Sequence, residues 1–275
     1  MRLTRIIVGT DFGKASLAAA RWVRRDVAPA AELLLVHVAP TAIAAASSAL
    51  ARRLFEAAAE LAPLGTGPVR TEARSGDAAV ALAEAAAQWS ADLVVVGEHE
   101  QGMRAPDAFG GTALRLVACA RTPVLAAAGV MAGPPLKLLV PVEGGDIGAP
   151  TFEWARDLEE RFDARLAIVL VAGGSRAGAV DAPPRWRQLA ATREADRLFV
   201  DAVAGDPPAA IAAEALRFHS DLVLMDADDA AAVSGVLRRA ACPVLIAIDP
   251  AAPMPPIADP RALDRMRADD WSHAS

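Results

Sequence analysis

The sequence predicts two tandem, doubly wound α/β domains, each built on a parallel sheet of five strands. The first observation is an internal repeat: RIIVGTD at residues 5–11 and KLLVPVE at residues 137–143 each open one half with an apolar run that ends in a carboxylate. The second is a tryptophan, Trp22 or Trp154, eleven residues after that carboxylate in both halves. The third is the regular alternation of apolar and amphipathic segments, which indicates parallel strands joined by right-handed helical crossovers.

The segments between these landmarks recur in the same order. Apolar runs at residues 31–40 and 164–173 supply the second strand of each half, and such runs are typical of strands buried on both faces. Residues 67–97 and 195–226 then match as a strand, a Gly-Asp turn, an amphipathic helix and a strand. We therefore expect the two Gly-Asp pairs to begin equivalent helices.

A last strand closes each half, at residues 121–127 and 241–247, and each is entered through a proline. These repeats divide the chain into a first domain at residues 1–130 and a second at residues 137–249. The sequence MAGPPL at residues 131–136 has the glycine and prolines of a linker. Each domain is expected to have the order βαβαβαβαβ.

The C-terminal segment, residues 250–275, is proline-rich at first and then carries a short helical pattern with Leu263, Met266 and Trp271. We expect it to be mostly solvated. Docking on a partner or on the core of the chain itself is the alternative.

The composition favours a globular protein of the cytoplasm. Hydrophobic residues are 54%, charged residues 23%, and the formal net charge is -6, which disfavours a nucleic-acid partner. The arginines alternate with acids along helical stretches and are expected on solvated faces. Cys119 and Cys242 lack paired spacing, so neither a disulfide framework nor a thiolate metal site is suggested. The apolar stretches fall short of bilayer length, and we expect no membrane association.

Ligands of doubly wound sheets bind beyond the carboxyl ends of the strands, where the strand order reverses. Asp11, Val38 and Gly97 follow or end strands of the first half and are expected at this edge. After Gly97, an irregular stretch leads to Gly110-Gly111-Thr112 at the start of a helix. A glycine-rich helix start offers free N–H groups to an anion, which outlines a phosphate site. The alternative is that the glycines serve only the turn.

Taken together, Asp11, VHVAP at residues 36–40, the strand DLVVVG, and the Gly-Thr helix start before TPVL resemble the universal stress protein family. The resemblance covers about residues 3–128 and 136–248, as in tandem members of that family. It implies the adenine-nucleotide α-hydrolase-like fold. It also implies edge-strand dimerisation, here between residues 124–127 and 244–247 of one chain as an intrachain pseudo-dimer, and a homodimer of chains is a further option.

The resemblance also implies an ATP site, with Mg²⁺, in the first domain. Carried over residue by residue, Asp11 and Val38 would surround the ribose and adenine. The phosphate would be held at Gly97 and at the helix start. The residues of that helix start are Gly110, Gly111 and Thr112. His99, which follows Gly97 on the ligand side, is expected either to contact phosphate or a signal, or to be an ordinary loop residue.

The loop departs from the family pattern G-x2-G-x9-G-[ST]. Glu100 stands where the second glycine belongs, Gly111 stands where a hydroxyl residue is expected, and Thr112 comes one position late. The loop also has a negative formal charge, which opposes a triphosphate unless the acids point outward or Mg²⁺ offsets them.

The second copy departs further. Residues 221–243 span nine fewer positions than the equivalent residues 92–123, so the loop is missing. Asp226 stands where Gly97 would be, and Asp228 and Asp229 lie at the expected helix start, where carboxylates satisfy the helix dipole. A metal site is the alternative, but three acids without histidine favour capping. We expect a degenerate copy without a nucleotide site.

The histidines show no metal-ligand spacing and no triad arrangement, and the loop contains no lysine. The leading hypothesis is therefore a non-catalytic stress-response protein whose first copy binds ATP or another adenine nucleotide. The alternatives are an interaction module with no nucleotide site, which would act on an unidentified protein partner, and a weak ATP hydrolase.

Overall fold

The computed structural model describes residues 3–97, 111–129, 131–143, 148–173, 198–228 and 230–249. In the first half the helices and strands follow the expected order. They are β1 (Arg5–Gly9), α1 (Lys14–Trp22), η1 (Val23–Val27), β2 (Glu32–Ala39), α2 (Ala42–Ala45), α3 (Ser48–Leu61), η2 (Ala62–Leu64), β3 (Val69–Ser75), α4 (Ala78–Trp89), β4 (Leu93–Gly97), α5 (Gly111–Cys119) and β5 (Val124–Ala127).

The described elements of the second half come in the same order. They are β6 (Lys137–Glu143), α6 (Ala149–Phe162), β7 (Arg165–Gly173), β8 (Leu198–Gly205), α8 (Pro207–Phe218), β9 (Leu222–Asp226), α9 (Ala230–Leu237) and β10 (Val244–Ala247). The C-terminal segment from residue 250 lies outside the described residues.

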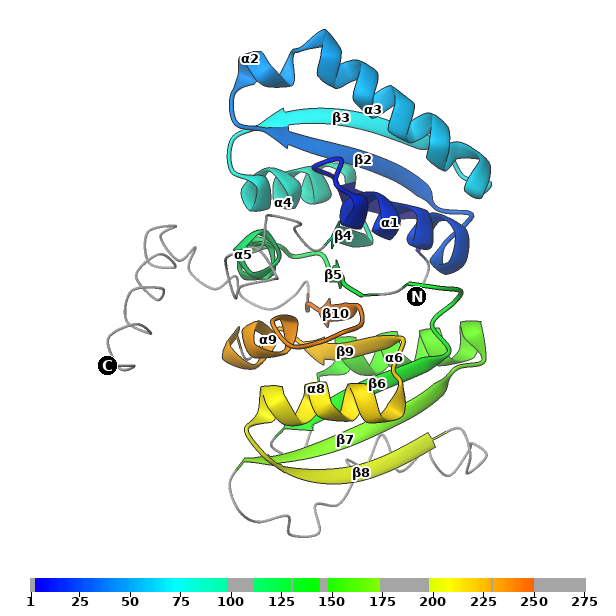
Figure 1. Cartoon of the computed structure of the whole chain (residues 1–275), viewed down its shortest axis with the longest axis vertical. Helices are drawn as coiled ribbons and strands as arrows, with labels where there is room; N and C mark the ends of the chain where they lie inside the picture. The colour runs from blue at the N-terminus through cyan, green and yellow to red at the C-terminus, as the bar shows by residue number, and fades with distance from the viewer. Residues whose placement is uncertain are drawn as a thin grey trace, which may run out of the picture.

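All ten strands belong to one sheet, in the order β3-β2-β1-β4-β5-β10-β9-β6-β7-β8 (Figure 1). Neighbouring strands are parallel throughout each half, as the sequence predicts. The halves join where β5 pairs antiparallel with β10, with Leu125 opposite Leu245. The two predicted five-stranded sheets are therefore the two halves of one sheet, and they meet through the two strands expected to pair within the chain.

Helices cover both faces of this sheet because its inner strands are apolar on both sides, as in β1, β4, β5, β9 and β10. One buried cluster lies between the sheet and α1, α3 and α6. The other lies between the sheet and α4, α5, α9 and α8, which follow one another in that order as a row along the sheet (Figure 1). The many alanines of these helices allow close packing against Val, Ile and Leu side chains of the strands.

The internal repeat extends to equivalent side-chain contacts. Asp77 caps α4 by accepting from the N–H groups of Ala79 and Val80, and Asp206 caps α8 by accepting from Ala209 N–H. Each cap follows a glycine in a positive-φ conformation, Gly76 at 109° or Gly205 at 134°. This agreement confirms that the Gly-Asp pairs begin equivalent helices.

A second pair of aspartates ties the strands of each half together. Asp92, just before β4, accepts hydrogen bonds from the N–H groups of Thr4 and Arg5 at 2.7 and 2.9 Å. Asp221, just before β9, accepts from those of Leu136 and Lys137 at 3.0 and 2.9 Å. The same carboxylate therefore anchors the start of the central strand in both halves.

Both cysteines are free, and no helix of the described residues is long and apolar enough to cross a membrane. Burial raises the pKa of the Cys242 thiol to about 12, and burial also raises the pKa of the half-buried Cys119 thiol. At pH 8 the thiolate fraction of Cys242 is then on the order of 1 in 10⁴.

We therefore expect Cys242 to resist alkylation by iodoacetamide at pH 8 in the folded protein and to react rapidly once guanidinium unfolds it. The raised pKa also sets the pH dependence of stability. The protonated thiol contributes stability below the unfolded pKa near 8.5, and this contribution is lost as the pH rises toward 12. Peptide mass mapping of the labelled protein checks the reactivity. Rapid native labelling of Cys242 would contradict the burial.

Candidate functional site

The first half contains a cavity of about 220 Å³ at the carboxyl ends of β1, β2 and β4. The starts of α4 and α5 complete its wall. Because β1 lies between β2 and β4 in the sheet, this is the point where the strand order reverses, as expected of a ligand site in a doubly wound fold. The polar lining consists of Thr10, Asp11, Ser16, His37 and Thr112.

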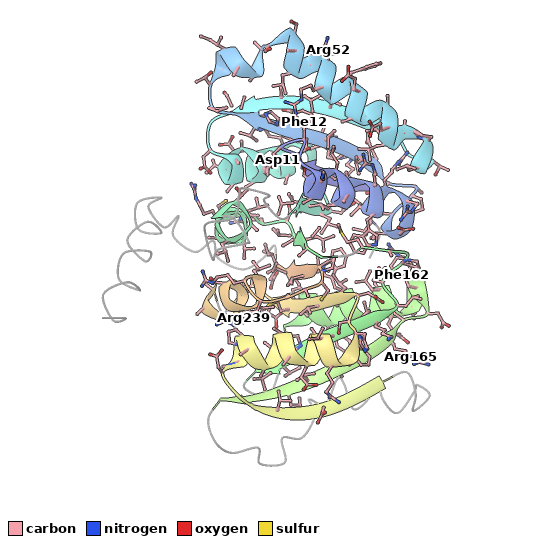
Figure 2. The ribbon with its side chains drawn as sticks, viewed as in Figure 1. Asp11, Phe12, Arg52, Phe162, Arg165 and Arg239 are labelled. Carbon is pink, nitrogen blue, oxygen red and sulfur yellow. The ribbon has the colours of Figure 1, made fainter. Side chains whose placement is uncertain are left out.

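Asp11 lies at the turn between β1 and α1 and lines the cavity (Figure 2). Its Oδ1 accepts from Gly13 N–H at 2.8 Å and from the Ser16 hydroxyl at 2.7 Å. The Ser16 hydroxyl lies 3.1 Å from that of Thr10, and both hydroxyl residues are buried. This network fixes the carboxylate against the start of α1, so its position is set before any ligand binds.

His37 forms part of the cavity wall from β2. Its Nδ1 lies 2.8 Å from the carbonyl oxygen of Thr10. A carbonyl oxygen only accepts hydrogen bonds, so this contact requires a proton on Nδ1 and leaves Nε2 of the neutral ring as an acceptor. The imidazole ring packs against the Phe12 ring at a centroid distance of 4.8 Å. The Arg53 guanidinium lies 4.2 Å from the centroid of the same Phe12 ring.

Gly97 has a packing role that does not depend on a ligand. A Cβ atom at Gly97 would lie 2.6 Å from the Cα and N atoms of Ser16, so glycine is required for α1 to pack this closely on β4. The close packing of α1 on β4 is therefore enough to explain why glycine stands at this position. It also lines the cavity.

The structure brings four of the predicted site residues together: Asp11, Val38, Gly97 and Thr112 all line the cavity. Gly111 is the first residue of α5, so the pair that begins this helix is Gly111-Thr112. His99 and Gly110 lie outside the described residues, as does Glu100.

Sequence reasoning missed Thr10, Ser16 and His37 as lining residues. Thr10 and His37 precede Asp11 and Val38 directly, so the strand-end argument could have included them. Ser16 carried no such signal, because its place in the wall depends on how closely α1 packs on β4.

The equivalent position of the second half is closed by a carboxylate. Asp226 ends β9 as Gly97 ends β4, and it accepts from Gly148 N–H at 2.8 Å and from the Thr151 hydroxyl at 2.5 Å. A Cβ atom at Gly148 would lie 2.4 Å from the Asp226 carboxylate. The glycine at this contact is therefore on different elements in the two halves. In the first half the strand ends in glycine and Ser16 lies on the helix. In the second half the strand ends in aspartate and glycine stands at the helix start.

Asp226 makes contacts that the sequence did not predict, because its carboxylate holds the start of α6. Capping of α9 by Asp228 and Asp229 stays a prediction. Asp228 is exposed, and Asp229 lies outside the described residues. No group of three or more histidine, cysteine or acidic side chains that could hold a metal occurs within the described part of the chain.

Comparison with solved structures shows the fold. A universal stress protein from Archaeoglobus fulgidus DSM 4304 matches with a TM-score of 0.72 and 17% identity over 90% of this chain and 97% of that chain. A candidate universal stress protein from Pseudomonas aeruginosa UCBPP-PA14 matches with a TM-score of 0.61 and 17% identity, covering 90% and 94% of the two chains. A protein of unknown function from Pseudomonas aeruginosa PAO1 matches with the same TM-score and identity, 0.61 and 17%, covering 97% and 98%.

Comparison by sequence places the first half in a family. No curated protein matches the chain. The sequence model described as "Universal stress protein family" matches residues 2–127, which run from the start of the chain to the end of β5 and include the whole described lining of the cavity. Residues 2–127 therefore form a domain of the universal stress protein family.

Proposed function

We propose that the first half is a non-catalytic, cytoplasmic nucleotide-binding domain whose cavity takes the nucleoside part of an adenine nucleotide such as ATP. The observation that carries this proposal is the convergence of Asp11, Val38, Gly97 and Thr112 on one cavity, because the sequence motifs predict the same four residues as parts of a nucleotide site. The two free cysteines agree with a reducing compartment.

The size and polarity of the cavity favour a nucleoside. Its volume of about 220 Å³ lies below the ~300 Å³ at which pockets for drug-sized ligands begin, so a complete triphosphate does not fit inside. Val36, Val38 and Leu82 provide apolar walls for a base, and Asp11 provides an acceptor for ribose hydroxyls. The phosphates would then lie toward the N-terminus of α5, where helix N–H groups attract anions.

The charges of the lining favour binding over hydrolysis. Among the lining residues that the structure describes, Asp11 is the one carboxylate, and neither lysine nor arginine is present. A site for phosphoryl transfer needs cations to neutralise the developing charge. Mg²⁺ bound with the nucleotide would supply positive charge near Asp11 and the N-terminus of α5, where carboxylate and phosphate oxygens suit this ion.

Calorimetric titration with ATP and Mg²⁺ tests the proposal, and Thr112→Val is the diagnostic variant. Thr112 is the second residue of α5 and lines the cavity, and we propose that its hydroxyl donates to a phosphate. A hydrogen bond to a charged group contributes about 1.5–3 kcal/mol, so we expect binding to weaken at least about tenfold.

Thr71→Val is the matched control, because Thr71 is exposed on β3 and lies outside the cavity lining. It should leave the dissociation constant unchanged. If the unmodified protein carries no nucleotide after purification and gives no heat with millimolar ATP, the proposal fails. Equal weakening by both threonine variants would show that the loss does not come from the cavity.

A second candidate function is a regulatory interaction module without nucleotide. The observation in its favour is Asp226, whose carboxylate lies against the start of α6 at the strand end equivalent to Gly97. In either case we propose that the second half is a degenerate copy that completes an intrachain pseudo-dimer through β5 and β10. Pairing of whole chains into a homodimer remains a prediction that light scattering would test.

A further inference from the structure

The two equivalent tryptophans of the repeat differ in one respect. Trp22 is 3% exposed, and its Nε1 donates a hydrogen bond of 2.7 Å to the carbonyl oxygen of Gly133. Trp154 is 1% exposed, and its buried Nε1 has no hydrogen-bond partner among the residues that the structure describes. Buried indole N–H groups almost always have an acceptor, because leaving one unpaired costs the hydrogen bond it would make with water. Within the described part of the chain, Trp154 therefore lacks a partner that its counterpart has.

The partner of Trp22 belongs to the linker that follows the last strand of the first half. After β5, residues 131–136 lead to β6, with Met131 against the buried cluster that contains both tryptophans. Pro135 is buried as well. The hydrogen bond from Trp22 to Gly133 thus fixes the linker against α1, beside the junction of the two halves.

The internal repeat that makes Trp22 and Trp154 equivalent also makes β5 and β10 equivalent. The segment after β10 is therefore the counterpart of the linker. Its sequence agrees: the linker reads Gly-Pro-Pro-Leu at residues 133–136, and the C-terminal segment reads Met-Pro-Pro-Ile at residues 254–257, at nearly the same distance after the last strand. A proline pair followed by a branched apolar residue thus comes after both halves.

We propose that residues 250–257 bind along α6 as the linker binds along α1, and that a main-chain carbonyl of this segment accepts the hydrogen bond of Trp154 Nε1. The chemistry of the segment suits this position. Prolines hold the chain extended, and they offer carbonyl acceptors while leaving no N–H group to be satisfied. The C-terminal segment then closes the second half, and the mostly solvated tail begins only after it.

Nuclear magnetic resonance of the indole groups tests the proposal. The full chain labelled with ¹⁵N-tryptophan carries five tryptophans, and Trp22→Phe and Trp154→Phe assign the two signals of interest. In the full chain we expect the Trp154 indole proton to exchange with deuterium as slowly as that of Trp22, within about tenfold. A chain that ends at Asp249 should exchange the Trp154 proton at least tenfold faster. A chain that ends at Ala258 keeps residues 250–257 and should exchange it as the full chain does, with Trp22 unchanged in all three.

A second measurement keeps the full chain, in case the chain that ends at Asp249 does not fold. A nitroxide attached in the variant M254C, with Cys119→Ser removing the more accessible native thiol, should broaden the Trp154 indole signal and leave that of Trp89, on the opposite face of the sheet, sharp. Unchanged Trp154 exchange after truncation at Asp249 would overturn the proposal. So would a nitroxide that broadens neither signal.

Discussion

Replacing Arg24 with methionine is expected to lower the free energy of unfolding by about 3 kcal/mol or more. Arg24 lies in η1 and is 1% exposed. Its guanidinium donates to main-chain carbonyls in three separate parts of the first half. These are the turn after η1, the junction of α3 and η2, and the turn before β3. These acceptors are the carbonyl oxygens of Pro29, Ala31, Leu61, Ala62 and Gly67.

The expected loss is large because methionine keeps most of the length of the side chain but removes every donor. These carbonyl groups would then lose the guanidinium donor. Pro29 O keeps its hydrogen bond from Thr66 N–H at 2.7 Å, but each buried acceptor left unsatisfied costs about 1–3 kcal/mol. Arginine suits this site because its planar group donates in several directions at once. Lysine, with a single ammonium group, should restore only part of the stability.

Arg25→Met is the matched control, made one residue further along η1. The Arg25 side chain is 54% exposed and pairs with Asp26 at the surface, so its loss should change the free energy of unfolding by less than about 0.5 kcal/mol. Urea denaturation followed by circular dichroism measures both variants. If Arg24→Met costs no more than Arg25→Met, the guanidinium does not hold these carbonyls.

Arg24 also shows where sequence reasoning fails for this chain. Its arginines alternate with acids on helical segments, which predicts solvated faces, and Arg25 fits that pattern. Arg24 does not, because its burial depends on carbonyls brought in from α3 and the chain before β3. The surroundings of a buried charge are set by tertiary packing, and the local pattern of charges contains no trace of them.

The fold itself was predictable because its signal is repeated. Two copies of each strand, each Gly-Asp cap and each tryptophan give two independent readings of the same element. The two strands at the junction were predictable for a related reason: residues 124–127 and 244–247 end their halves as short apolar strands. Only a family resemblance, however, indicated that they pair with each other.

The candidate site was predictable in part. Asp11, Val38 and Gly97 follow from the rule that ligands meet the carboxyl ends of parallel strands. The contact of Gly97 with Ser16 in the first half and of Asp226 with Gly148 in the second was not predictable in full, because each depends on the distance between a helix and a strand. The aspartate was visible in the sequence, whereas its contact with the start of α6 required the structure.

Replacing Leu125 with aspartate is expected to lower the free energy of unfolding by about 4 kcal/mol and to separate the unfolding of the two halves. Leu125 on β5 lies directly opposite Leu245 on β10, and the two are 3% and 2% exposed. A carboxylate there would be buried against leucine in the middle of the sheet, with no partner for its charge. Thr71→Asp is the matched control, because Thr71 is exposed on β3 and the same carboxylate would remain in water.

The junction is the place where such a change has the widest effect. Three residues on each side, Val124–Ala126 and Val244–Ile246, make the strand pair that turns two five-stranded sheets into one. With the pair intact, hydrogen exchange of β1 and β6 should report one cooperative opening, since neither half can expose its edge alone. With Leu125→Asp, the two strands should open at different denaturant concentrations. Loss of stability without this separation would mean that the halves are coupled elsewhere, through α5 against α9 or through the linker at Trp22.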